Sequence, residues 1–246
     1  MPIIYGHRGA KGEAPENTLF SFQHCLAQGV THCELDLRLA QDGVLMVFHD
    51  ATLKRTIGQT GTLAAKPSTE LSQLDASANF NRAYPQAAKP PYCPIPTLEQ
   101  LFQQCAFEHW QLEIKGVARA QAKATVLAVK NLVERYQLTE RVTLTSASHQ
   151  VLHAAMQWAP ELSRGCVVEW RWQDPLAIAK RYNCELLALN WKLCTSRLVE
   201  RSKAKGLHLS LWTVNEPKQM LRLANMGVDS LITDFPGLAS ATLGSR

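Results

Sequence analysis

The chain lacks several features that would place it in common functional classes. None of its apolar runs approaches the roughly 18 residues of a membrane-spanning helix, so no integral membrane association is expected. It contains neither a GxxxxGKS/T nor a GxGxxG motif, so nucleotide-dependent phosphoryl transfer and dinucleotide redox chemistry have no support. The N-terminus shows no charged leader followed by an apolar core and a cleavage site, and a cytoplasmic location is therefore expected.

Charged residues and cysteines are present, but neither forms a concentrated motif. The 26 Lys and Arg residues exceed the 21 Asp and Glu residues by five, yet the densest basic stretch is only Arg201–Lys205. Such a stretch is typical of a solvated helix face, so nucleic acid is not expected as a partner. The seven cysteines include no CxxC pair, which disfavours a zinc or redox site. With 46% hydrophobic residues, the chain is predicted to fold as a single domain over residues 1–246.

Short apolar runs alternate with longer amphipathic segments along the chain. The apolar runs predict eight strands: Ile3–Gly6, His32–Leu39, Trp110–Lys115, Val142–Thr145, Ser163–Val168, Leu186–Asn190, His208–Thr213 and Ser230–Thr233. The amphipathic segments predict seven helices: Thr18–Gln28, Thr97–Cys105, Arg119–Tyr136, His149–Trp158, Pro175–Tyr182, Ser196–Lys205 and Pro217–Asn225. A tail from Phe235 is the candidate for an eighth. This alternation favours an α/β fold with a closed (β/α)8 TIM barrel, with an open doubly wound sheet as the alternative.

One part of the chain interrupts the alternation. The turn signal at Gln41–Val44 predicts that the second strand continues into a hairpin ending near Asp50. Residues 51–96 then lack clear periodicity and are too long for a plain loop in a compact domain. We expect them to form a small subdomain inserted after the second strand. A linker between two domains is the alternative, but Met1–Asp50 contains too few elements to fold alone.

The second predicted strand carries charged side chains at alternate positions. Glu34, Asp36 and Arg38 share one face, and Leu35 and Leu37 share the other. In a barrel the leucines must face the helices, so the two carboxylates point inward. Because like charges are costly to bury together, a divalent cation is expected between them, and oxygen ligands favour Mg²⁺ or Ca²⁺.

Further polar residues follow the ends of neighbouring strands. His7 and Arg8 end the first strand, and His49 ends the predicted hairpin. Glu113 and Lys115 share one face of the third strand, which makes Glu113 a third candidate metal ligand. A metal and two cations suit a phosphodiester anion, and two histidines suit the base and the acid that its cleavage requires, in either order.

The chain also resembles a known family. It contains, in order, the segments His7-Arg8-Gly9, Ala14-Pro15-Glu16-Asn17-Thr18, Glu34-Leu35-Asp36, Asp42-Gly43, His49-Asp50, Leu53-Lys54-Arg55-Thr56, Ile95-Pro96-Thr97-Leu98, Glu113-Ile114-Lys115, Trp212-Thr213-Val214-Asn215 and Thr233-Asp234. This pattern is similar to that of the glycerophosphodiester phosphodiesterases, especially the small bacterial cytoplasmic enzymes.

The resemblance implies a role for each site residue. It implies a TIM barrel with an insertion, and a metal held by Glu34, Asp36 and Glu113. It implies His7 and His49 as the acid–base pair. It places Arg8 and Lys115 near the phosphate and Trp212 on the glycerol side. Glu169, near the end of the fifth strand, is assigned to the substrate-binding residues, with a charge at the rim as the alternative.

The implied reaction converts a glycerophosphodiester and water into sn-glycerol 3-phosphate and an alcohol. We expect the 2-hydroxyl of the substrate to attack first, giving a cyclic phosphate that water then opens. Two alternatives are a phospholipase D-like enzyme acting on lysophospholipids, which requires an apolar patch at the barrel mouth, and a non-catalytic barrel that binds phosphate or nucleic acid. Four tryptophans are expected to pack in the core or against helices rather than at the pocket rim: Trp158, Trp170, Trp172 and Trp191. His109 is predicted to lie in a helix or loop. No oligomeric state is predicted.

Overall fold

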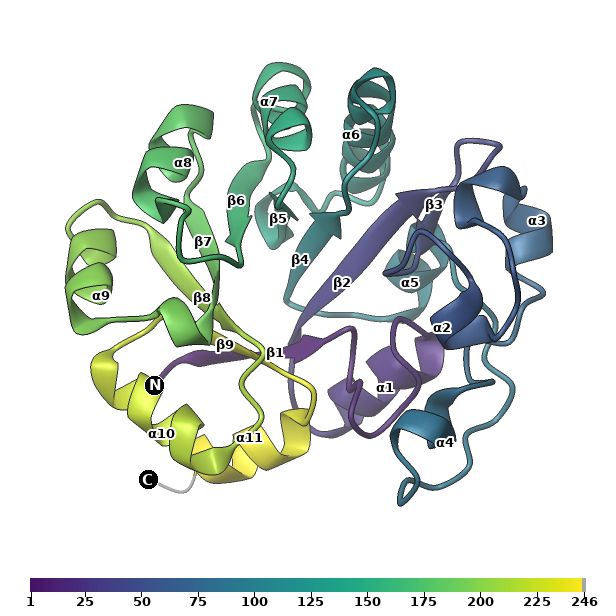
Figure 1. The fold of residues 1–246 in the computed structure, drawn as a ribbon, viewed down its shortest axis with the longest axis horizontal. Helices are drawn as coiled ribbons and strands as arrows, with labels where there is room; N and C mark the ends of the chain where they lie inside the picture. The colour runs from purple at the N-terminus through teal and green to yellow at the C-terminus, as the bar shows by residue number, and fades with distance from the viewer. Residues whose placement is uncertain (245–246) are drawn as a thin grey trace.

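In a computed structural model that describes residues 1–244, eight parallel strands form a closed barrel surrounded by helices (Figure 1). The strands are β1 (Ile3–His7), β2 (His32–Leu39), β4 (His109–Ile114), β5 (Val142–Ser146), β6 (Ser163–Val168), β7 (Leu186–Asn190), β8 (His208–Trp212) and β9 (Ser230–Thr233). Because β1 pairs with both β2 and β9, the sheet closes on itself, which excludes the open doubly wound alternative. The predicted TIM barrel is confirmed, and each predicted strand matches within one residue at either end.

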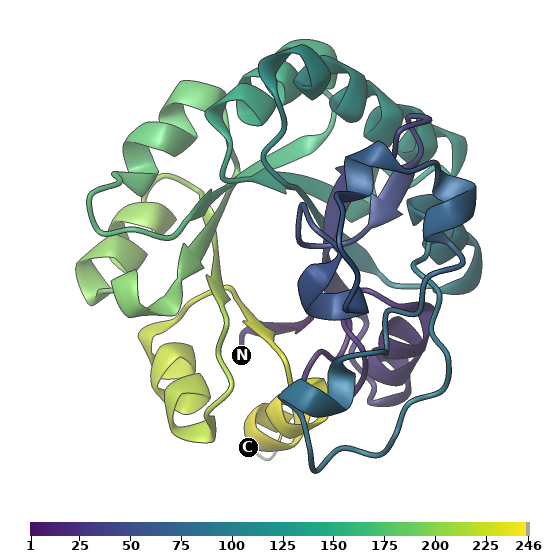
Figure 2. The same cartoon turned by 45° about the vertical axis from the view of Figure 1, so that its right-hand side comes forward.

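Eight helices follow the barrel strands and cover the outside of the sheet (Figure 2). They are α1 (Leu19–Ala27), α5 (Leu98–Gln104), α6 (Arg119–Arg135), α7 (His149–Trp158), α8 (Pro175–Tyr182), α9 (Ser196–Lys203), α10 (Pro217–Met226) and α11 (Pro236–Gly244). Local sequence fixes their ends: Thr97 and Gln100 form a reciprocal capping box at α5, and Gly227 ends α10 with a φ of 80°. The tail from Phe235, which was the candidate for an eighth helix, forms α11.

The segment between β2 and α5 forms a small structure of its own on one side of the barrel opening (Figure 2). Strand β3 (Leu45–Val47) pairs antiparallel to β2 and forms the predicted hairpin with it. It is followed by the short helices α2 (Lys54–Ile57), η1 (Leu63–Ala65), α3 (Ser68–Leu71) and α4 (Phe80–Ala83). Apolar side chains of α2, η1 and α3 bury one another together with Met46, Phe48 and Ile95. The segment is therefore packed rather than a linker, while the division of the chain into domains stays a prediction.

Side chains alternate between the two faces of the barrel strands. Leu35 and Leu37 belong to the apolar layer between the sheet and the helices. The barrel interior is polar, and Gln111 Nε2 donates a hydrogen bond to Ser210 Oγ across it at 3.1 Å. This alternation directs Glu34 and Asp36 into the barrel, as predicted.

The predictions for three residues were wrong: His109, Trp170 and Trp172. His109 is the first residue of β4 and is half-buried, with its Nδ1 3.1 Å from the Tyr5 hydroxyl. Trp170 and Trp172 are 54% and 81% exposed, so they do not pack in the core, whereas Trp191 packs against the core and Trp158 lies under Lys123 of α6. Trp170 and Trp172 lie in the turn between β6 and α8, where no apolar helix face covers them. Among residues 1–244, no helix is both long and apolar enough to cross a membrane.

Candidate active site

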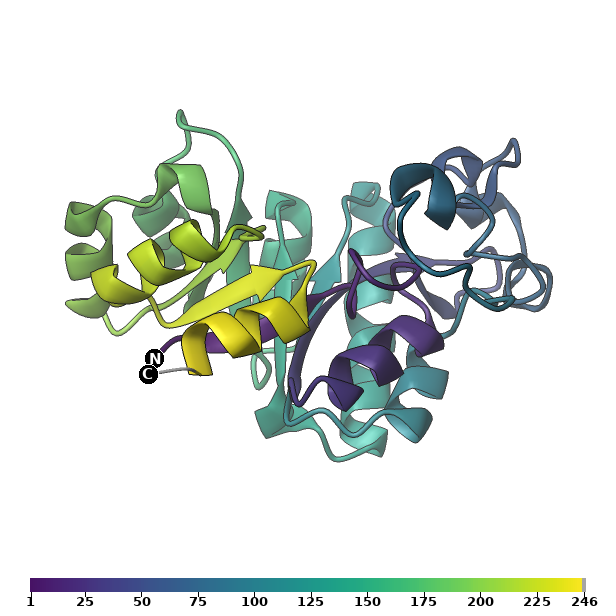
Figure 3. The ribbon, with the colours of Figure 1, turned by 90° about the horizontal axis from the view of Figure 1, so that it is seen from below.

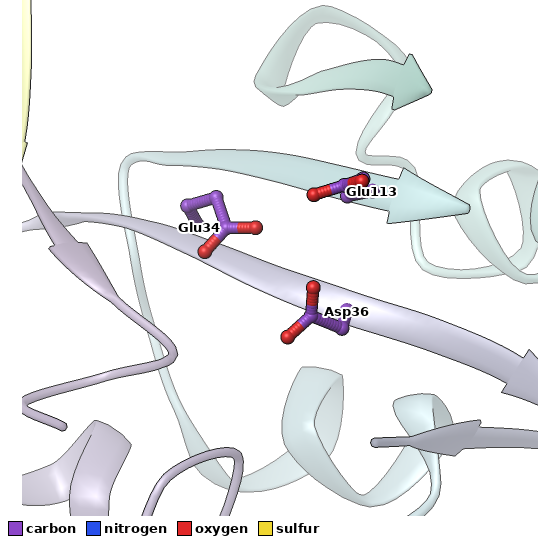
Figure 4. A group of neighbouring side chains, drawn as sticks. All are labelled: Glu34, Asp36 and Glu113. Atoms are coloured by element: carbon purple, nitrogen blue, oxygen red, sulfur yellow. The ribbon is translucent and has the colours of Figure 1, made fainter. Parts of the chain in front are cut away.

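The strand registers bring the predicted site residues together at the carboxyl ends of β1, β2 and β4. His7 on β1 is opposite Glu34 on β2, and Asp36 on β2 is opposite Glu113 on β4. The three carboxylates converge on one space from adjacent strands (Figure 4). Parallel barrels commonly carry their active sites at this end, because each strand there delivers a residue to the same opening.

The carboxylate trio, Glu34, Asp36 and Glu113, has the geometry of a cation site. One oxygen from each residue lies within 4.8 Å of the others. Burial, together with the neighbouring carboxylates, raises the pKa of Glu34 well above its usual range. The buried Oε2 of Glu34 finds no hydrogen-bond partner among residues 1–244. Three oxygen ligands, one of them unsatisfied, fit a hard divalent cation such as Mg²⁺ or Ca²⁺.

Two cations flank the trio. Lys115 Nζ lies 2.9 Å from Asp36 and 2.8 Å from Glu113, and Arg8 Nε lies 3.0 Å from Asp36. Burial alone would raise the pKa of Asp36, but Arg8 and Lys115 outweigh it and hold that pKa far below its usual range. Arg8 also contacts Glu16 at 2.8 Å. The cations are thus fixed beside the carboxylates, at a position suited to an anionic substrate.

His7 is held by a carboxylate from the last barrel strand. Its Nδ1 lies 2.5 Å from Oδ1 of Asp234, the residue that follows β9. The hydrogen bond with His7 lowers the pKa of Asp234 to about 2 against the opposing effect of burial. Asp234 is therefore ionised at neutral pH, so Nδ1 of His7 carries the hydrogen and donates it. The other nitrogen, Nε2, lies 3.8 Å from Glu34. Burial and the charge of Arg8 lower the pKa of His7 to about 4.

His49 is held in a similar way from the other side. Its Nδ1 lies 2.5 Å from Oδ1 of Asp50, and its backbone carbonyl accepts a hydrogen bond from Arg38 Nε at 2.7 Å. Asp50 in turn accepts a hydrogen bond from Arg55 at 2.6 Å, and Arg55 also pairs with Glu16. Burial lowers the pKa of His49. Both histidines thus point Nδ1 at an aspartate, which leaves Nε2 for other chemistry.

These groups surround one cavity of about 470 Å³ at the barrel mouth. The predicted residues that line it are His7, Arg8, Glu34, His49, Glu113, Lys115, Glu169 and Trp212. Asp36 is fully buried behind the wall, where Asn17 donates a hydrogen bond to it at 2.8 Å. Glu169 is exposed at the mouth, whereas the indole Nε1 of Trp212 is buried with no hydrogen-bond partner in the described part of the chain.

Comparison with known proteins identifies the family to which this site belongs. Residues 7–238 match the model of the Glycerophosphoryl diester phosphodiesterase family. The chain belongs to this family. It is 30% identical to a Glycerophosphodiester phosphodiesterase of Caldanaerobacter subterraneus, over 95% of this chain and 94% of that protein.

Solved structures agree with this assignment. A Silicibacter pomeroyi structure is 28% identical with a TM-score of 0.91, covering 99% of this chain and 93% of the other. An Oleispira antarctica phosphodiesterase, solved in complex with the product sn-glycerol-3-phosphate, is 27% identical with a TM-score of 0.88 and covers 100% and 98% of the two chains. As a member of the glycerophosphoryl diester phosphodiesterase family, the protein is a phosphoric diester hydrolase, which rejects the non-catalytic barrel.

Five residues of this phosphodiesterase site had no role in the sequence analysis. They are Glu16, Asn17, Asp50, Arg55 and Asp234, and each stands in a segment that carries the family resemblance. The pairing of Asp234 with His7 spans 227 positions and exists only because the barrel closes between β9 and β1. The segment Thr233-Asp234 was the only signal for it.

Proposed function

We propose that the protein hydrolyses glycerophosphodiesters to sn-glycerol 3-phosphate and an alcohol, using two histidines and a divalent cation. The observation that carries the proposal is the cavity at the barrel mouth. Two histidines fixed by aspartates, two cations and an acidic trio all meet there. The product bound to the Oleispira antarctica relative supports this substrate class.

The cation would be held by the carboxylate trio, Glu34, Asp36 and Glu113. When bound, a divalent cation neutralises charge on the non-bridging phosphate oxygens and orients the diester. Lys115 already contacts two members of the trio, so it limits their mutual repulsion. Together with Arg8 it places positive charge where the phosphorane-like transition state gathers negative charge.

His7 and His49 supply the base and the acid. Each imidazole is held through Nδ1, so Nε2 is the atom that takes or gives the proton. One histidine takes the proton of the attacking hydroxyl, and the other gives a proton to the leaving alkoxide. Both side chains line the same cavity, as this division of labour requires.

The attacking hydroxyl is the 2-hydroxyl of the substrate's own glycerol. Its oxygen forms a bond to phosphorus while the bond from phosphorus to the alcohol oxygen breaks. Water then opens the cyclic phosphate, and the two histidines exchange roles. Trp212 and Glu169 both line the cavity. We assign Trp212 to the glycerol and Glu169 to the mouth, where the departing alcohol leaves.

The test is the release of glycerol phosphate from glycerophosphocholine, with and without a chelator. His7→Ala, His49→Ala and Glu34→Ala are each expected to abolish turnover. His153→Ala, an exposed histidine of α7 outside the cavity, serves as the matched control and keeps full activity. A variant that retains activity removes its residue from the mechanism. Full activity after chelation would show that the reaction does not require a divalent cation.

A further inference from the structure

The helices α6, α7 and α8 enclose a second cavity on the outside of the barrel, which we call the outer cleft. Its volume is about 610 Å³, within the range typical of small-ligand sites, and its lining includes Arg119, Lys123, His149, Trp158 and Arg181. Figure 1 shows the three helices side by side. Figure 3 shows the segment between β2 and α5 on the other side of the barrel from α8, and that segment takes no part in the outer cleft.

The outer cleft borders the catalytic cavity but is separate from it. Gly116 lines the catalytic cavity, and Arg119, three positions later, lines the outer cleft. After β5, Ala147 and His149 are divided between the two cavities in the same way. No residue in the range 1–244 lines both. A ligand in the outer cleft would therefore occupy a site of its own, and the inference does not depend on the proposed function.

The outer cleft gathers cations without counter-ions. Arg119, Lys123 and Arg181 are exposed, and none of them forms an ion pair with a carboxylate in the described part of the chain. Among the described residues, no Asp or Glu lines the cleft. Further along α6, by contrast, Lys130 pairs with Glu134 at 2.8 Å. Three like charges around one cavity repel one another, so an anion bound between them would be stabilised.

Aromatic rings hold several of these groups at the walls of the cleft. Lys123 Nζ lies 3.5 Å from the centroid of the Trp158 ring, and the guanidinium carbon of Arg181 lies 5.4 Å from that of Tyr182. The buried Tyr182 also places its hydroxyl 2.9 Å from Nδ1 of His149, which leaves Nε2 available to a ligand. Because these contacts restrict the side chains in advance, less conformational entropy is lost when an anion binds.

We propose that the outer cleft binds an oligophosphate, either an inorganic one or the phosphate chain of a nucleotide. Arg119 and Arg181 offer forked pairs of N–H donors that match phosphate oxygens, and Lys123 adds a point charge. These cations come from two helices on either side of α7, so several linked phosphates contact them better than a single phosphate does. They also surround one cavity instead of forming an extended stripe, which favours a compact anion over a nucleic acid.

The test measures the binding of pyrophosphate to the full chain by isothermal titration calorimetry, in buffer without divalent cations. The triple variant Arg119→Gln/Lys123→Gln/Arg181→Gln should raise the Kd about tenfold or more. The matched control is Arg197→Gln/Arg201→Gln/Lys203→Gln, which removes the same charge from exposed positions of α9 that line neither cavity. Its Kd should stay within about twofold of the wild-type value. An equal loss in both variants would show that only net charge matters and would overturn the proposal.

A second measurement locates the bound pyrophosphate, because the catalytic cavity contains cations too. The imidazole C–H resonances of His149, assigned with His149→Gln, should shift on titration and saturate with the Kd found by calorimetry. His149 lines the outer cleft, whereas His7 and His49 line the catalytic cavity. Shifts confined to His7 and His49 would place the pyrophosphate in the catalytic cavity and overturn the proposal.

Three further ligands identify the class of anion. ADP that binds more tightly than pyrophosphate would assign the outer cleft to a nucleotide, and weaker binding of ADP would assign it to an inorganic oligophosphate. Orthophosphate that binds as tightly as pyrophosphate would overturn the need for linked phosphates. Single-stranded DNA that binds more tightly than both, and that the triple variant of the cleft no longer binds, would replace the proposal with a nucleic-acid surface. Absence of pyrophosphate binding at millimolar concentration would overturn the proposal and leave the proposed function untouched.

Discussion

Replacing Asp234 by asparagine should damage the enzyme more than removing the side chain altogether. Asn215 decides this, because its Oδ1 accepts a hydrogen bond from the backbone amide of Asp234 at 2.9 Å. That contact turns its Nδ2 toward Oδ2 of Asp234, at 2.8 Å. In Asp234→Asn, an amide nitrogen at the Oδ2 position would meet this Nδ2 donor. The new asparagine must therefore place its oxygen there and its nitrogen toward His7.

This orientation of the new amide changes the tautomer of His7. An amide nitrogen facing Nδ1 forces Nδ1 to accept, so the hydrogen moves to Nε2, the atom proposed to take or give the proton. We expect kcat to fall by roughly 10²–10⁴-fold with a much smaller change in KM, as is typical when an acid–base histidine is held in the wrong tautomer. In Asp234→Ala, water can fill the space and either tautomer stays available, so the loss should be smaller.

The assay is choline release from glycerophosphocholine, with kcat and KM determined separately for wild type, Asp234→Ala and Asp234→Asn. Thermal unfolding of each protein checks that the fold is intact. The reasoning fails if Asp234→Asn is as active as wild type, or if Asp234→Ala is the slower of the two variants.

Three further predictions follow from the site. A substrate analogue without the 2-hydroxyl should turn over poorly, whereas normal turnover would favour direct attack by water. Lys115→Met leaves Asp36 and Glu113 without the cation that they share. In the presence of a chelator, urea titrations should show a free energy of unfolding that is lower by about 3 kcal/mol, as for other broken buried ion pairs. Added Mg²⁺ or Ca²⁺ should restore part of this loss. Hydrogen bonds and charges from Arg55 and Arg8 outweigh burial and lower the pKa of Glu16 from 4.5 to about 2. Because the folded-state pKa is the lower one, this stabilisation is complete above about pH 4.5 and is lost as the pH falls toward 2. It amounts to at most about 3 kcal/mol, and urea unfolding of Glu16→Gln should show a correspondingly weaker pH dependence over that range.

The barrel and its acidic trio could be predicted because both depend on local pattern. Strand periodicity alone assigns Glu34 and Asp36 to one face and the leucines to the other. Strands that follow one another in a parallel barrel are neighbours, so the third predicted strand had to bring Glu113 beside Asp36. The observed register places these two residues directly opposite each other.

The partners of the histidines could not be predicted in this way. The bond from His7 to Asp234 depends on how the first and last strands meet, and periodicity within a strand carries no information about that register. The exposure of Trp170 and Trp172 was missed for a different reason. A turn of a few residues between a strand and a helix has no period, so hydrophobicity alone suggested burial where the backbone provides no apolar face.

Helix α2 of the segment between β2 and α5 is tied to the active site through Arg55. Arg55, at the start of α2, pairs with Asp50 and with Glu16. Asp50 holds His49, and Glu16 holds Arg8, which in turn contacts Asp36. One arginine outside the barrel thus joins a proposed acid–base residue to a phosphate-binding cation and a metal ligand. The +5 net charge of the chain says nothing about this arrangement, because the decisive charges cancel in pairs. Function in this protein depends on which charges the fold places side by side, and the segment between β2 and α5 supplies Asp50 and Arg55 to this set.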